Sequence, residues 1–301
     1  MSLTGFFAAF VPASMFPYVA AIAPSEKVGL YMGSIVASGT FGVIFGRVAM
    51  GLLTTLFGWE LSFKIFAFLV FILWLLALFV LGRNSDQKES SNKNKSLIGL
   101  YKISIKQLLN FNILSILAAG FSLFFGFLGM VTFLTYRLAD SPFNFSAGQI
   151  GWISFAGITA LIAPFSGNTS KKTGIFKIIF PSLLMCLFSF QLMGWFESIL
   201  MITAGLLLLF LSVYSCQPLL FLMIGENVSK ETLGAASSLY ILFCIGGGSL
   251  SSIFLGSVWD TYGWAGITII CSIFVIISIL FMLIVKKRID SFDGKKGLNP
   301  I

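Results

Sequence analysis

The stretch EKVGLYMGSIVASGTFGVIFGRVAMGLLTTLFGW, residues 26–59, spaces glycines through a long apolar segment and ends on the pair Gly58-Trp59. A second stretch, ETLGAASSLYILFCIGGGSLSSIFLGSVWDTYGW, lies at residues 231–264, a shift of 205 residues that is the distance from Trp59 to Trp264. In this register the coincident positions are Gly29 and Gly234, Gly42 and Gly247, Gly51 and Gly256, and the two Gly-Trp pairs. So many shared glycines at one offset indicate an internal duplication.

The composition indicates the environment in which these stretches fold. Of the 301 residues, 57% are hydrophobic and 10% are charged, and the mean hydropathy is +0.99. A soluble domain carries about 25% charged residues. Runs of about 20 apolar residues recur along the chain, each long enough to cross a ~30 Å hydrocarbon core as a helix. We therefore predict an all-α polytopic membrane protein whose first partner is the lipid bilayer.

Nine apolar segments predict nine transmembrane helices, separated by short breaks with turn-forming residues. In one break, Ser146 and Gln149 have the spacing of a helix-capping box. The longest break, 83–109, is polar and basic and then mildly amphipathic, which indicates a cytoplasmic linker that ends in a surface helix. The segments are roughly 4–23, 28–56, 61–82, 110–137, 147–166, 175–195, 198–223, 233–257 and 264–285.

The basic residues predict the orientation. If the linker is cytoplasmic, all 19 Lys and Arg residues except Arg47, Lys64 and Arg137 fall on its side of the membrane. This bias explains the net charge of +8 better than a nucleic-acid surface does, because cytoplasmic loops collect Lys and Arg. We expect the N-terminus outside, the C-terminus in the cytoplasm, and no nucleic-acid partner.

The duplication also divides the chain. It aligns the second and third helices of the first group with the last two helices of the second group. The second group, 110–285, is then a six-helix half, and 1–82 supplies the last three helices of an equivalent half. Between them lies the linker 83–109, and 286–301 forms a basic cytoplasmic tail. On this reading three helices are expected before residue 1.

With these halves the residues resemble the major facilitator superfamily, most closely its bacterial twelve-helix, YnfM-like branch, which is related to sugar- and drug-efflux permeases. The resemblance lies in LTGFFAAFVPASMFPYVAAIAPSEKVG (3–29) for the fourth helix, GTFGVIFGRVAMGLLTTLFGW (39–59) for the fifth, and YRLADSPFNFSAGQIGWISFAG (136–157) for the junction of the seventh and eighth. The chain would then correspond to helices 4–12. The resemblance implies alternating-access secondary transport of a small solute in the bacterial inner membrane, with proton-coupled efflux of a drug-like or sugar-like compound favoured.

The stretch GNTSKKTGIFK, 167–177, resembles the second-half copy of the superfamily's cytoplasmic loop motif. Gly167, Lys172 and Gly174 fit that motif. Lys171 stands where the motif has Asp, and Ile175 stands where it has a basic residue. This departure weakens the expectation of a charge-relay gate at this loop.

The spaced glycines have two readings. Small residues on one helix face let backbones approach closely in lipid, as in any tight bundle. The resemblance adds the reading that the fifth and eleventh helices slide on their neighbours during transport. The candidate packing glycines are Gly42, Gly46, Gly51, Gly247 and Gly256.

Arg47 is the charge set among those glycines. A mid-span arginine costs about 2.5–3.5 kcal/mol on insertion scales, so its position must relieve that cost or use it. It either reaches the outer surface or a neighbouring helix, or it lines a cavity for an anionic or polar substrate. The duplication places neutral Ser252 at the equivalent position, which favours function slightly.

Two further groups are cavity or gate candidates. Tyr136 and Arg137, at the outer end of one predicted helix, are either an interfacial aromatic beside a cation or a border of the substrate entrance. Tyr214, Ser215 and Gln217 form the densest polar group within a predicted span, next to Pro218. They either line the cavity or hydrogen-bond between helices.

The remaining residues restrict the chemistry. The chain has no histidine, its four cysteines form no CxxC pair, and no phosphate-binding GxxxxGK[ST] motif is present. We expect no enzyme activity, no catalytic residue, no metal and no cofactor. No Asp or Glu lies mid-span, so an acid for H+ coupling would belong to the expected preceding helices.

We expect a monomer. The alternatives are an inactive, N-terminally truncated transporter and a non-transporting membrane scaffold or sensor.

Overall fold

The computed structural model describes residues 27–82, 110–228 and 233–296, together with Met15, Tyr18, Val19, Ala23 and Pro24. The described elements are helices, with no strand among them. The predicted first helix, the linker with its amphipathic part, and the last five residues lie almost wholly outside the described residues. The elements are α2 (Val28–Gly82), α4 (Phe111–Ala139), α5 (Ala147–Ile153), the 3-10 helix η1 (Ser154–Ile162), α6 (Ala163–Thr173), α7 (Phe176–Trp195), α8 (Ile199–Glu226) and α9 (Leu233–Lys296).

Six of the helices in the described part of the chain are long and apolar enough to cross a membrane. One of the six, in α9, contains two predicted spans, 233–257 and 264–285. The predicted span 147–166 is not among the six, because α5, η1 and α6 divide it into three pieces. The prediction of an all-α membrane bundle is confirmed. The six spans are Ala37–Thr54, Leu56–Phe79, Phe111–Ala139, Phe176–Trp195, Ile199–Glu226 and Ala236–Ser291.

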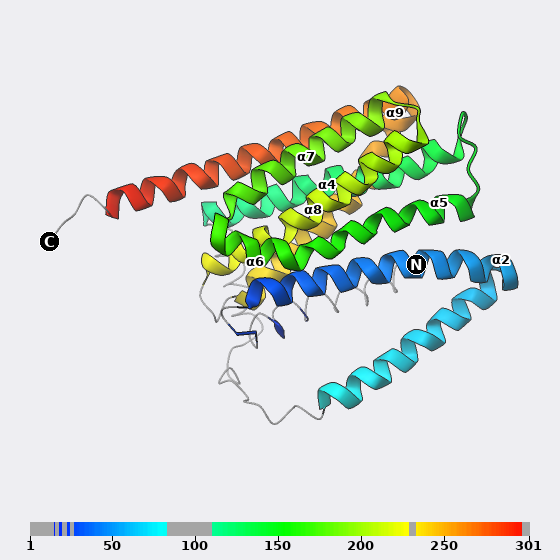
Figure 1. The fold of residues 1–301 in the computed structure, drawn as a ribbon, viewed down its shortest axis with the longest axis horizontal. Coiled ribbons are helices and arrows are strands. Elements are labelled where there is room, and N and C mark those ends of the chain that lie inside the picture. Colours follow the sequence, from blue (N-terminus) through cyan, green and yellow to red (C-terminus); the bar gives the residue numbers. More distant parts are fainter. Residues whose placement is uncertain are drawn as a thin grey trace.

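The duplicated Gly-Trp pairs mark the points where α2 and α9 turn back on themselves (Figure 1). Gly58 has φ 75° and ψ 166°, and Gly263 has φ 58° and ψ −150°. Residues that carry a Cβ atom avoid these φ/ψ values, whereas glycine adopts them readily. Each of these long helices is therefore two spans joined at a glycine, and we call them the first and second arms of α2 and of α9.

The predicted capping box at the start of α5 is confirmed. The Ser146 backbone N–H donates to Gln149 Oε1 at 2.9 Å, and the Gln149 backbone N–H donates to Ser146 Oγ at 3.4 Å. Each residue thus satisfies an amide of the other at a helix end, where helical partners are lacking.

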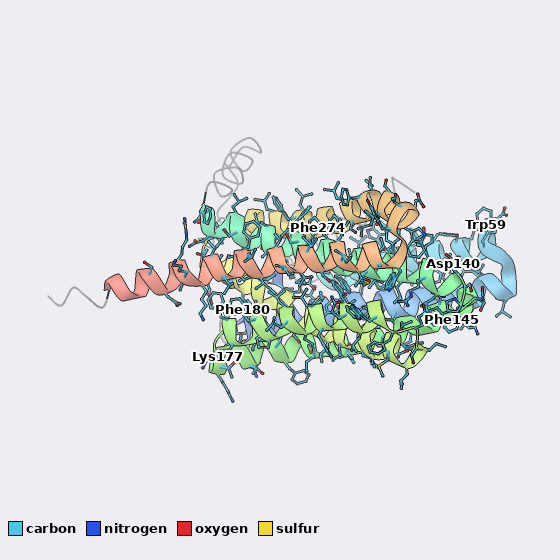
Figure 2. All side chains as sticks on the ribbon, turned by 90° about the horizontal axis from the view of Figure 1, so that it is seen from above. Trp59, Asp140, Phe145, Lys177, Phe180 and Phe274 are labelled. Carbon is cyan, nitrogen blue, oxygen red and sulfur yellow. The ribbon has the colours of Figure 1, made fainter. Side chains whose placement is uncertain are left out.

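The core lies in the second group of helices. There α4 packs along α9, and α7 packs along α8. Phe125 of α4 stacks on Phe274 of α9 with ring centroids 3.7 Å apart, near the middle of the bundle (Figure 2). At Gly247 of α9 an added methyl group would overlap the Phe121 carbonyl oxygen of α4, so these two backbones are in contact.

The bundle has two distinct ends. Trp59 and Asp140 lie at one end and Lys177 at the other (Figure 2); we call these the Asp140 end and the Lys177 end. Past the Lys177 end, α9 stays helical to Lys296, so the basic tail begins as an extension of that helix. Arg288 of this extension lies 3.9 Å from the centroid of the Phe111 ring of α4.

The two arms of α2 have different surroundings. The first arm packs against α5, η1, α6 and α8 and buries Ala37 and Ile44. The second arm diverges from the other helices (Figure 1). Among its described side chains from 59 to 79, Ser62 alone is buried. Its apolar surface faces lipid or another helix.

Candidate functional site

Four aromatic rings from α4 and α8 form a cluster in the interior. Phe210 and Tyr214 are stacked, with centroids 5.9 Å apart and planes 20° apart. Phe127 meets both edge-on, at 5.3 Å from Phe210 and 6.0 Å from Tyr214. Phe124 meets Phe127 edge-on at 6.0 Å. Offset stacks and edge-to-face contacts are the favourable ring geometries, so this set is well packed. We call these four residues the aromatic cluster.

The aromatic cluster lies where the first arm of α2 meets the second group. A Cβ built at Gly157 of η1 would lie 2.7 Å from Ile44 Cδ1 of α2 and 3.3 Å from Phe210 Cε1 of α8. Glycine at this position is what allows α2, η1 and α8 to approach. Phe127 and Phe210 stand close to the middle of α4 and α8, so the cluster lies about halfway along the bundle.

Gln217 follows Tyr214 by one helical turn. Its Oε1 is buried and has no hydrogen-bond partner in the structure. Pro218, which is buried within α8, has no N–H, so the helix loses one hydrogen bond here. The hydroxyl of Tyr240 in α9 donates to the Gln217 backbone carbonyl at 3.3 Å. Ser215 is buried on α8 as well. A buried acceptor without a partner costs free energy, which a donor from a ligand would recover.

Arg137 lies at the Asp140 end and is 9% exposed. Its guanidinium donates to the Met193 carbonyl and, at 3.4 Å, to the Phe196 carbonyl. The Trp264 Nε1–H donates to the same Met193 oxygen at 3.0 Å. The guanidinium also lies 4.9 Å from the Trp264 ring centroid and 5.7 Å from that of Phe143. We call Arg137, Trp264 and the α7 carbonyls the latch.

The latch completes the end of α7. That helix ends at Trp195, and the carbonyls of a helix's last turn have no helical donor. Arg137 supplies donors and a positive charge to the negative end of the α7 dipole, and Glu197 adds a favourable electrostatic interaction. One side chain thus connects α4, α7 and the turn of α9.

Tyr136, the neighbour of Arg137, has a different environment. It is 54% exposed, and its ring lies 5.6 Å from Phe133 and 6.2 Å from Trp259 of α9. Adjacent residues of α4 therefore contact different parts of α9: Tyr136 contacts the end of the first arm, and Arg137 contacts the start of the second.

Arg47 stands in the first arm of α2, three residues after Ile44. Its side chain lies outside the described residues. The position places it near the contact with η1, and its role stays a prediction.

The five candidate glycines differ in what surrounds them. Gly247 is the one in backbone contact with α4. A Cβ built at Gly42, Gly46, Gly51 or Gly256 meets no atom within 4 Å. The described packing therefore requires a small residue at Gly247, and the packing role of the other four stays a prediction.

The motif-like stretch after the broken span is mostly helical. Gly167 is buried within α6, Lys172 is exposed in its last turn, and Gly174 caps it with φ 94°. The backbone N–H of Gly174 donates to Ser170 O at 2.8 Å. The positive φ explains the glycine at 174. Whether this stretch takes part in gating stays a prediction.

The sequence indicated Tyr214, Gln217 and Arg137 as candidates, and their functional roles stay predictions; it did not indicate the aromatic rings that lie beside Tyr214 and Arg137. The spacings were available: Phe124 and Phe127 are three residues apart, and Phe210 and Tyr214 are four apart, so each pair shares a helix face. With 34 phenylalanines in the chain, that signal does not stand out. Among the described residues, no group of three or more His, Cys, Asp or Glu could hold a metal ion.

Long apolar helices, two of them bent back at Gly-Trp turns, define a polytopic membrane protein. The Major Facilitator Superfamily profile matches residues 1–252, and the chain belongs to this superfamily, as its motifs predict. Membership and the names of its relatives indicate a transporter and not an enzyme.

Three relatives illustrate the similarity. An uncharacterized transporter of Buchnera aphidicola subsp. Schizaphis graminum is 28% identical over 95% of this chain and 68% of its own length. A multi-drug resistance efflux pump PmrA homolog of Lactococcus lactis is 25% identical, over 94% of this chain and 69% of that protein. The inner membrane transport protein YnfM of Escherichia coli is 24% identical, over 88% and 62%.

Proposed function

We propose that the protein moves a small solute across the bacterial inner membrane by secondary active, alternating-access transport. The observation that carries this proposal is the aromatic cluster with the unpartnered Gln217 Oε1, located where α2 meets the second group of helices. Solute sites of such transporters lie near the midplane, between the parts that move.

The proposed division of the chain follows the duplication. Residues 1–82 belong to one half and 110–285 to the other, joined by the linker 83–109 and followed by the basic tail 286–301. The halves rock about the aromatic cluster as a monomer, with the Lys177 end and the C-terminus in the cytoplasm, because basic residues favour that side.

We further propose efflux of a drug-like or sugar-like compound. The name of the Lactococcus lactis relative, a multi-drug resistance efflux pump homolog, supports this direction. H+ is the proposed coupling ion. In the described helices the carboxylates stand near helix ends and turns, so the titrating acid would lie outside them.

The candidate residues receive proposed roles from their positions. Tyr214 and Gln217 contact the solute, and Ser215 supports them within α8. Arg137 and Tyr136 hold the Asp140 end as a gate. Arg47 contributes a positive charge at the contact between the halves. The spaced glycines allow sliding, and Gly167, Lys172 and Gly174 form the loop at the Lys177 end.

A second candidate is a membrane protein of this fold that does not transport by itself, either an inactive fragment or a scaffold. The exposure along the second arm of α2 favours it, because such a surface can accept another helix. The two candidates make opposite predictions for the purified chain.

The test is a solute screen on the 301-residue chain in proteoliposomes with an imposed pH gradient. Radiolabelled sugars and fluorescent aromatic compounds are followed inside the vesicles. We expect at least one solute to move faster than in protein-free liposomes, and collapse of the gradient to stop it. Movement of none, with correctly folded and inserted protein, would exclude transport by this chain and support the second candidate.

A further inference from the structure

The stacked pair in the aromatic cluster has the form of a binding platform. Phe210 and Tyr214 lie nearly parallel, four residues apart on α8, and Phe127 closes their side edge-on. Although they stand mid-span in a packed bundle, both remain partly exposed. Flat rings presented in this way favour a ligand that is itself flat and aromatic.

The unpartnered amide adds a polar requirement. Gln217 stands one turn after Tyr214 on the same helix, and its buried Oε1 is without a donor. A buried acceptor without a partner costs free energy, and a ligand O–H or N–H would recover it. Asn112, the other residue with such an atom in the described part of the chain, stands near the start of α4, far along that helix from the cluster.

The cluster is also poor in polar groups. Its four rings and Gln217 carry no charge, and they offer one hydroxyl and one amide. A sugar presents a donor or acceptor at almost every carbon and would leave most of them unpaired against phenylalanine, which is costly. These five side chains therefore suit one donor on a large apolar ring system.

We propose that the solute is a planar aromatic compound carrying an O–H or N–H donor, bound on the Phe210–Tyr214 pair with its donor on Gln217 Oε1. This inference rests on the proposed transport function and chooses between the two substrate classes left open there. The ring system supplies the affinity, and Gln217 selects for the donor.

The test compares two neutral probes with the same rings, 2-naphthol and 2-methoxynaphthalene, which differ in having an O–H or an O–CH3 group. Binding to the purified 301-residue chain in lipid nanodiscs is measured by titration, with empty nanodiscs subtracting partition into lipid. We expect 2-naphthol to bind up to about tenfold more tightly than its methyl ether, the range of one hydrogen bond.

Variants assign the two contributions. Gln217→Leu should abolish the preference for 2-naphthol and leave the affinity for 2-methoxynaphthalene unchanged. Phe210→Leu should weaken both probes. Phe176→Leu is the matched control, because Phe176 and Phe180 form a similar stack in α7, with centroids 6.0 Å apart and planes 22° apart, away from the cluster. It should change neither affinity.

Three results would overturn the proposal: equal affinity for both probes in the unmodified chain, an equal loss for both probes in Gln217→Leu, or a loss in Phe176→Leu as large as that in Phe210→Leu. The inference and the proposed function fail separately. If proteoliposomes accumulate a sugar and the chain binds neither probe, the substrate class is wrong and transport stands. If 2-naphthol binding depends on Gln217 and no solute moves, the proposed aromatic site is supported and the proposed transport function is contradicted.

Discussion

The two Gly-Trp turns have the same sequence and the same kind of backbone, yet their tryptophans differ. Gly58 and Gly263 both adopt positive φ. Trp59 is 65% exposed, whereas Trp264 donates to the Met193 carbonyl and lies against the Arg137 guanidinium. The turn itself is therefore encoded locally. The latch at the second turn needs partners from two other helices.

The same contrast appears between two glycines in the first arms of α2 and α9. Gly42 and Gly247 are equivalent in the duplication, but only at Gly247 does the described structure bring another backbone, that of Phe121, into contact. The duplicated positions thus share their backbone geometry in both copies. How much each one contributes to stability depends on which other helices pack against it.

The largest expected effect comes from breaking the latch. Replacing Arg137→Gln removes the guanidinium from the α7 carbonyls and from the Trp264 face. We expect a loss of about 2–4 kcal/mol in the free energy of unfolding, measured by denaturant titration in detergent micelles. Arg137→Lys should recover part of it. A loss within about 0.5 kcal/mol for Arg137→Gln would mean that the latch does not stabilise the bundle.

The second comparison concerns Gly247→Ala and Gly42→Ala. The first change forces a methyl group onto the Phe121 carbonyl, so the helices must separate, at a cost of about 1–3 kcal/mol. The second places a methyl group in open space and should be neutral or slightly stabilising, because alanine favours helix. Thermal unfolding of the two variants measures the difference. Equal destabilisation would show that Gly42 is packed against something beyond the described residues.

The third prediction tests the shared turn. Gly58→Ala and Gly263→Ala should each cost about 1–3 kcal/mol, since both glycines occupy backbone regions that side chains avoid. Proteolysis and thermal unfolding of the two variants should report similar losses. Gly256→Ala, where a Cβ has room, is the control. If only Gly263→Ala destabilises, the turn at Gly58 is not held as described.

The smallest effect separates the two tryptophans. Trp264→Phe loses the donor to Met193 and part of the contact with Arg137, for which we expect about 1–2 kcal/mol. Trp59→Phe should stay within about 0.5 kcal/mol, because its ring is exposed. The measurement is again the free energy of unfolding in micelles, and similar losses at both positions would mean that the contacts of Trp264 do not stabilise the second turn.

What the sequence predicts well is local. The helical spans follow from apolar length, and the reversals at Gly58 and Gly263 follow from two residues that recur at one offset. The capping box of Ser146 and Gln149 is equally local, as both partners lie within one turn. The stretches that resemble the family contain two of these features, the Gly58-Trp59 pair and the capping box.

The candidate site is predictable only in part, because it depends on which helices are neighbours. Arg137 reaches a carbonyl 56 residues away, and no spacing rule links those positions. Tyr214 and Gln217 are recognisable as polar residues within a span, whereas their contacts with Phe127 and Tyr240 require the packing of three helices. Arg47 illustrates the limit: its place on α2 is clear, and its role remains a prediction.

The break within the predicted span 147–166 has a rotational consequence. The nine residues of η1 advance by about 120° each, whereas an α-helix advances by about 100°. Over nine residues the difference accumulates to about half a turn. Residues of α6 therefore face about the opposite direction from the one an α-helical wheel continued from α5 would assign. The 3-10 helix η1 therefore offsets the rotation of α6 relative to α5 along the side of the bundle that contacts α2. Conversion of η1 to α-helix would rotate α6 relative to α5 while the three segments stay continuous.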